Sequence, residues 1–167
     1  MRIRAVTDAD LPAIQAIYAH HVATSLGTFE TEPPTVPEMR VRCTGIVQAG
    51  FPYLVGELDG RIVGFAYANQ FRPRAAYSGT LEDSIYVAAD ATRRGVGKTL
   101  LAELIKQCIA LGMRQMLALI GDSGNAASIA VHRACGFVQV GVMTDVGRKL
   151  GRWVDVVIMQ RELAQPG

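Results

Sequence analysis

Hydrophobic positions along this chain repeat with two different periods, and the period changes at clusters of Gly, Pro and polar residues. Alternating apolar and polar positions predict strands, whereas apolar positions every three or four residues predict amphipathic helices. Strands are predicted over residues 2–6, 53–58, 61–70, 80–87, 115–120, 137–145 and 153–161. Helices are predicted after Asp8 or Asp10 as far as His21, over 38–48, over 95–110, and from Asn125 or Ala126 to Cys135.

Local signals indicate how these segments connect. Asp59-Gly60 between two apolar runs is typical of a tight hairpin turn, and residues 147–151 predict a longer turn before the last strand. The strand–helix–strand order within residues 80–120 predicts a parallel pair with a right-handed crossover. The sequence therefore predicts one α/β domain over residues 1–167, with a central mixed, twisted sheet of about seven strands flanked by about four helices.

Composition narrows the class of protein. Half of the residues are hydrophobic and 19% are charged, which favours a compact fold, and a net charge of +2 is too small to indicate a nucleic-acid partner. No run reaches the roughly 18 apolar residues of a membrane span, and no signal segment opens the chain, so we expect a cytoplasmic protein without a membrane partner. The Cys and His residues lack metal-ligand spacing, so no metal is expected: Cys43, Cys108, Cys135, His20, His21 and His132.

The stretch from Glu82 to Thr99 carries the strongest chemical signal. An acidic residue opens a predicted strand, and the strand leads through a polar loop into a basic, Gly-rich turn at the start of a helix. Glycines allow backbone N–H groups to turn inward, and a helix N-terminus adds partial positive charge, so this turn predicts an anion site. Its basic side chains are Arg93, Arg94 and Lys98.

Three interpretations of the turn are open on the residues alone. Gly97-Lys98-Thr99 copies the end of a Walker A phosphate loop, but Thr92 stands where the first glycine of that motif belongs, and residues 117–122 only loosely resemble a Walker B strand. A nucleotide-binding enzyme is therefore the alternative from a different class, and a structural turn with solvated arginines is another. A metal-free pyrophosphate cradle, with amides of residues 93–99 directed at the phosphates, fits best.

Two motifs resemble the GNAT superfamily of N-acetyltransferases. Thr92-x-x-Gly95-x-Gly97 is similar to the family's acetyl-CoA pyrophosphate loop, although Thr92 replaces the usual Gln or Arg. The segment 125–137, with Asn, Ser, His and Gly-Phe at family spacing, resembles a second family motif, and the predicted element order matches over essentially the whole chain. Residues 80–87, 125–137 and 151–155 resemble the phosphinothricin and methionine sulfoximine acetyltransferase subgroup. His132 stands where many members of the superfamily have Tyr, and this subgroup has His.

The resemblance implies acetyl-CoA as co-substrate and direct transfer in a ternary complex. An amine attacks a thioester only when it is unprotonated, so Glu82 is the candidate base, through water, and His132 is the candidate acid for the departing thiolate. Backbone N–H groups along 85–87 are candidate oxyanion donors and can pair with the pantetheine arm. The alternative for Glu82 is a surface carboxylate without a catalytic role, and the alternative for His132 is a histidine of the core with a structural role. The candidate cofactor-binding residues are Ile85, Tyr86, Val87, Arg93, Arg94, Gly95, Val96, Gly97, Lys98, Thr99, Asn125 and Ser128.

An amino-acid-like acceptor carries a carboxylate, which an arginine fork binds well. The loop before the Glu82 strand supplies Arg72 and Arg74, and the long loop 24–37 supplies two further candidates. The alternative for Arg72 and Arg74 is a solvated position on the surface, and the alternative for Phe29 is a side chain that folds onto the core. The candidate acceptor-binding residues are Phe29, Glu30, Arg72, Arg74, Tyr77, Glu82 and Ser84.

The expected reaction is acetylation of the α-amine of a small acceptor of the phosphinothricin, methionine sulfoximine or sulfone type, in a detoxifying role. Acetylation of a protein N-terminus or a polyamine is the alternative within the fold, and a coenzyme-binding module without catalysis is another. The subgroup resemblance also implies a homodimer with the site near its interface, with Trp153 at the inter-subunit surface.

Overall fold

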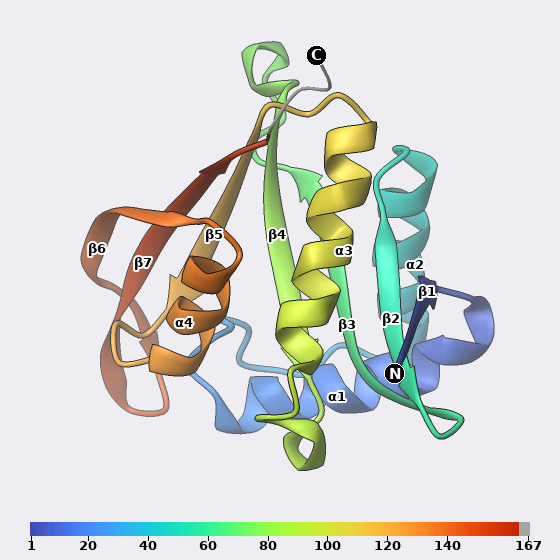
Figure 1. The fold of residues 1–167 in the computed structure, drawn as a ribbon. Coiled ribbons are helices and arrows are strands. Elements are labelled where there is room, and N and C mark those ends of the chain that lie inside the picture. Colours follow the sequence, from blue (N-terminus) through green and yellow to red (C-terminus); the bar gives the residue numbers. More distant parts are fainter. Residues whose placement is uncertain (164–167) are drawn as a thin grey trace.

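The computed structural model describes residues 1–163 and contains one seven-stranded sheet in the order β1-β2-β3-β4-β5-β7-β6 (Figure 1). β4 and β5 are parallel, and every other neighbouring pair is antiparallel. The strands are β1 (Arg2–Ala5), β2 (Tyr53–Leu58), β3 (Arg61–Gln70), β4 (Thr80–Val87), β5 (Gln115–Gly121), β6 (Val138–Lys149) and β7 (Arg152–Glu162).

Helices cover both faces of the sheet. α3 and α4 lie on the near face in Figure 1, and α1 and α2 lie behind it. The bounds are α1 (Leu11–Thr24), α2 (Val36–Gln48), α3 (Val96–Ala110) and α4 (Ala126–Ala134), with short 3-10 helices η1 (Asp8–Asp10), η2 (Ala75–Tyr77) and η3 (Ala89–Ala91). The predicted fold class and element order are confirmed.

Each face of the sheet has its own apolar core. Leu100, Leu101 and Leu104 on α3 are fully buried in the core that lies beneath α3 and α4. On the other face, Ile14 of α1 packs with Phe65 of β3. Because each helix contributes one apolar stripe and the strands contribute alternate residues to each face, the two cores together fix the position of β4 between them.

Several boundaries differ from the prediction, among them the end of α1, which is Thr24 rather than His21, the start of α2 and the end of β6. α2 begins at Val36 rather than 38, because Thr35 caps it: the Glu38 N–H donates to Thr35 Oγ1 at 3.4 Å, and Thr35 N–H donates to Glu38 Oε2 at 2.6 Å. β6 runs to Lys149, so the predicted turn 147–151 shrinks to Leu150 and Gly151. Apart from these, the hairpin strands β2 and β3 have the predicted bounds.

Candidate active site

The sheet opens between its two parallel strands. β4 pairs with β5 only from Thr80 to Glu82, whereas its other edge pairs with β3 as far as Val87. Beyond Glu82 the edge of β4 that faces β5 therefore pairs with no strand of residues 1–163. A cavity of about 660 Å³ lies at this opening. The predicted site residues that line it are Phe29, Glu82, Ser84, Ile85, Tyr86, Val87, Arg93, Gly95, Val96, Gly97, Lys98, Asn125, Ser128 and His132.

Backbone groups of Ile85 and Val87 face this opening. Phe71 N–H donates to Thr80 O, and Ala88 N–H donates to Val63 O, at the two ends of the β3–β4 ladder. Bonded pairs alternate along an antiparallel ladder, so the even-numbered residues of β4 bond to β3 and the odd-numbered ones face away. Tyr86, one of the predicted cofactor contacts, thus directs its backbone groups to β3. A ring nitrogen of His21 lies 2.9 Å from Val87 O, on the open edge.

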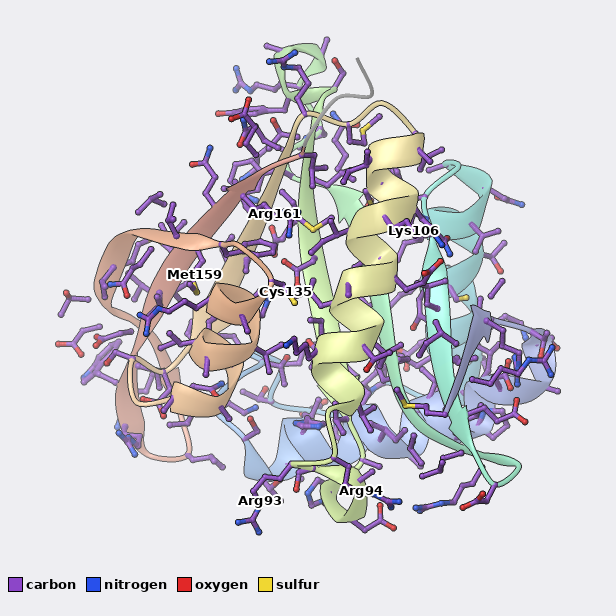
Figure 2. The ribbon with its side chains drawn as sticks, in the orientation of Figure 1. Arg93, Arg94, Lys106, Cys135, Met159 and Arg161 are labelled. Atoms are coloured by element: carbon purple, nitrogen blue, oxygen red, sulfur yellow. The ribbon has the colours of Figure 1, made fainter. Side chains whose placement is uncertain are left out.

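The Gly-rich turn lies at the end of the cavity where α3 begins. Gly95 has φ 77° and Arg93 has φ 59°, a left-handed conformation that favours Gly. Arg93 and Arg94 lie at this end of the molecule (Figure 2), but only Arg93 lines the cavity. Thr99 is directed elsewhere, since its hydroxyl donates to Gly95 O at 3.0 Å. The first-turn amides of α3 form the kind of N-terminus that binds anions.

Glu82 lies where β4 and β5 separate. Burial raises the pKa of its carboxyl, Arg72 opposes this shift, and the neighbouring Asp83 adds to it. Arg72 Nη1 lies 3.8 Å from Glu82 Oε2, and its guanidinium stacks over the Phe71 ring at 4.2 Å. A carboxyl with a raised pKa at the edge of a cavity has the properties of a general base.

His132 is buried and both of its ring nitrogens have partners. Nε2 lies 3.0 Å from Asp83 Oδ2, and Nδ1 lies 2.8 Å from the backbone O of Ser128. Burial lowers the pKa of His132, but the hydrogen bond and charge of Asp83 and the Ser128 carbonyl outweigh it, so the pKa is raised. Asp83 was missed from the sequence. The sequence does contain a sign of its role: Asp83 is a charged residue between Leu81 and Ile85, two apolar residues on the same face of β4.

Asn125 caps the helix that carries His132. Its side-chain oxygen accepts a hydrogen bond from Ser128 N–H at 3.2 Å, so the residue has a structural role as well as lining the cavity.

The predicted acceptor residues do not all gather at the cavity. Phe29 lines it, with its ring against Gly147 of β6 and Gly121 of β5, where a side chain at either glycine would collide. Glu30 instead forms a two-bond ion pair with Arg42, at 2.6 and 3.0 Å.

The loop before β4 also lies outside the cavity lining. Tyr77 packs edge-on to Phe71 at 5.5 Å, and Arg74 is exposed. Arg72 contacts the site through its ion pair with Glu82. On the other side, Lys149 is buried and donates to Thr28 O at 2.7 Å, a contact that the sequence did not suggest.

Within residues 1–163, no group of three or more His, Cys, Asp or Glu side chains is placed to hold a metal ion. In the same part of the chain, no helix is long and apolar enough to cross a membrane.

Comparison with known proteins defines the family. Residues 3–158 match the model of the acetyltransferase (GNAT) domain. The chain is 57% identical, over 96% of its length and 82% of the relative's, to a phosphinothricin N-acetyltransferase of Alcaligenes faecalis. It is 38% identical, over 96% of its length and 94% of the relative's, to an L-methionine sulfoximine/L-methionine sulfone acetyltransferase of Pseudomonas paraeruginosa.

A solved structure agrees with this assignment. The phosphinothricin acetyltransferase of Sinorhizobium meliloti, crystallised with AcCoA, superposes with a TM-score of 0.95 at 44% identity, covering 98% of this chain and 88% of that one. This chain belongs to the GNAT acetyltransferase family. It is an acetyl-CoA-dependent N-acetyltransferase, as the resemblance in its sequence predicted.

Proposed function

We propose that this enzyme acetylates the α-amine of a small amino-acid-like compound, by direct transfer within a ternary complex. The observation that carries the proposal is the open edge of β4, which runs from the carboxyl of Glu82 to the Gly95 turn. A pantetheine arm can pair with the backbone of Ile85 and Val87 as an added strand, and the first turn of α3 can bind the pyrophosphate.

In this mechanism Glu82 accepts a proton from the amine through water, and the free amine nitrogen attacks the thioester carbonyl carbon. The oxyanion that forms needs fixed donors, and the N–H groups of Ile85 and Val87 on the open edge are the ones available. When the C–S bond breaks, the sulfur takes up a proton, for which His132 is the source. Burial raises the pKa of the Glu82 carboxyl, which is the direction that makes a carboxylate a stronger base.

The chemistry around Glu82 favours an acceptor with a carboxylate. Arg72 stacks on Phe71 and has Glu82 as its ion-pair partner, so an acceptor carboxylate bound by Arg72 would bring its α-amine toward the base. Arg74 adds a second positive charge to the same loop. Positive charge at this place disfavours a polyamine. The relatives named for phosphinothricin and methionine sulfoximine support acceptors of that kind, and with them a detoxifying role.

We further infer a cytoplasmic homodimer built from this single domain. β6 is an edge strand with an exposed apolar row, including Val138, Val140 and Val142, and Trp153 of β7 is 60% exposed beside it. A long apolar edge strand is a hazard for aggregation unless a partner covers it. The free thiols of Cys43, Cys108 and Cys135 suit a reducing compartment.

An acetylation screen tests the acceptor. The panel is phosphinothricin, methionine sulfoximine and sulfone, free amino acids, short peptides and spermidine, with thiol release as the signal. The proposal expects the amino-acid-like compounds to be acetylated most efficiently. A preference for a peptide N-terminus or for spermidine would instead support acetylation of a protein N-terminus or of a polyamine. Calorimetric titration with acetyl-CoA, and with ATP and magnesium, separates this enzyme from a nucleotide-binding one, which would bind only ATP.

A further inference from the structure

A buried ion pair joins the two walls of the cavity. Asp83 belongs to β4, and His132 belongs to α4, which follows β5. The pair spans the opening between the parallel strands, with side chains 1% and 6% exposed. Both residues line the cavity. The contact therefore lies inside the site, beside the edge of β4 along which the coenzyme is proposed to run.

The hydrogen-bond partners of His132 favour its protonated form. A backbone carbonyl can only accept, so Nδ1 carries a hydrogen that it donates to Ser128 O. Nε2 lies 3.0 Å from Asp83 Oδ2, a carboxylate oxygen to which a protonated ring donates its second hydrogen. A protonated ring therefore directs both of its hydrogens at acceptors, and the raised pKa of His132 agrees with this form. The negative charge of Asp83 contributes to raising the pKa of three other titratable groups: Cys108 on α3, Cys135 after α4, and Glu82 on β4. Figure 2 places Cys135 beside α3 and α4.

A third group extends this arrangement into the cavity. Ser128 Oγ lies 3.4 Å from His132 Nδ1, and Ser128 is only partly buried. At the other end, Asp83 Oδ1 is buried and accepts no hydrogen bond from the described residues. An unpaired buried acceptor costs stability, so stability alone does not explain an Asp at this position. Solvent exposure of the side chains thus increases along the three residues, from Asp83 through His132 to Ser128.

We propose that Asp83, His132 and Ser128 form one proton-donating chain, in which the Ser128 hydroxyl protonates the departing sulfur and Asp83 is the positioning residue that keeps His132 protonated. The proposal rests on the proposed function, since it supplies the acid for that reaction. It also explains how an imidazolium with both nitrogens engaged delivers a proton without leaving Asp83.

Each turnover moves one proton from the amine to solvent and one from the chain to sulfur. The C–S bond breaks and its electron pair goes to sulfur, which takes the hydrogen of Ser128 Oγ. Ser128 Oγ, at 3.4 Å from His132 Nδ1, in turn takes the Nδ1 hydrogen, which shifts to it from Ser128 O at 2.8 Å. This leaves a neutral imidazole whose Nε2–H still bonds to Asp83. The proton lost by the amine leaves through Glu82, and His132 recovers a proton from solvent through Ser128. No redox partner or metal is needed.

Two variants and one spectrum test the chain. Ser128→Ala should lower kcat about 100-fold with little change in the KM for acetyl-CoA, the loss typical of removing a general acid. Asp83→Asn should lower the pKa of His132, so the alkaline limb of the kcat profile should move about 1–3 units to lower pH. A merely structural role for Asp83 would not move that limb. Ser123→Ala and Asp59→Asn, in exposed turns, are the matched controls.

The ¹⁵N spectrum of histidine-labelled protein should show both ring nitrogens of His132 protonated at pH 7, and one of them deprotonated in Asp83→Asn. A neutral His132 in the unsubstituted protein, or a kcat for Ser128→Ala within twofold of it, would overturn the chain. Should Asp83→Asn fail to fold, Ser128→Ala and the spectrum of the unsubstituted protein still decide. A protein that acetylates no amine refutes the proposed function instead, while the spectrum continues to test the hydrogen-bonded chain.

Discussion

Replacing Glu82 with Gln removes the proposed base while keeping the shape of the side chain. General-base catalysis contributes about 10²–10⁴ in rate, which corresponds to about 3–5 kcal/mol of barrier. Stability should change little, since Glu82 is 32% exposed and its contact with Arg72 is a 3.8 Å ion pair, worth about 0–1 kcal/mol. We therefore expect kcat to fall at least about 100-fold while the melting temperature hardly moves.

The pH profile makes this prediction specific. Glu82 is active as the carboxylate, and burial raises its pKa, so the rate should rise with pH through a value above that of an ordinary glutamate. Glu82→Gln should remove this rising limb. The assay is thiol release at saturating acetyl-CoA across pH 5–9, with Glu103→Gln on the outer side of α3 as the matched control. An unchanged limb in Glu82→Gln would refute the reasoning.

Three further predictions address the acceptor, the coenzyme and the dimer. Arg72→Ala should raise the KM for amino-acid acceptors and leave the KM for acetyl-CoA unchanged; an effect on neither moves the carboxylate site elsewhere. Gly95→Ala, at φ 77°, should cost about 1–2 kcal/mol in a thermal melt and weaken acetyl-CoA binding by calorimetry, whereas Gly45→Ala in α2 should do neither. Val142→Lys should convert a dimer to a monomer by light scattering, whereas Val41→Lys, at a more exposed valine of α2, should not; a persistent dimer in Val142→Lys would mean that the interface does not include β6.

The hydrophobic pattern predicted most of the fold because its signals are local. Asp59 and Gly60 specify the hairpin turn by their positive φ, and the helical stripe of α3 specifies which face is buried. The end of β6 was placed wrongly for a long-range reason. Gly147 resembles a turn residue in the sequence, but in the structure it continues the strand and makes room for the Phe29 ring.

The features of the site also separate into those that are local in the sequence and those that depend on long-range packing. The turn at Gly95 and the open edge after Glu82 lie in one continuous stretch, so the sequence placed them together. Asp83 and His132 are 49 residues apart and meet because α4 packs against β5, the parallel neighbour of β4, which no local pattern states. Nearness in the sequence does not bring every predicted acceptor residue to the cavity. The loop carrying Arg74 and Tyr77 precedes β4 directly but lies outside the cavity lining.

Initial-rate kinetics with phosphinothricin and acetyl-CoA test the central claim most directly. If the coenzyme occupies the open edge of β4 and the amine attacks it there, both substrates saturate, the double-reciprocal lines intersect, and each thiol released matches one N-acetyl product. Acetyl-CoA binding without thiol release above the blank, for phosphinothricin and for the rest of the amine panel, would contradict the account and leave a coenzyme-binding protein without this activity.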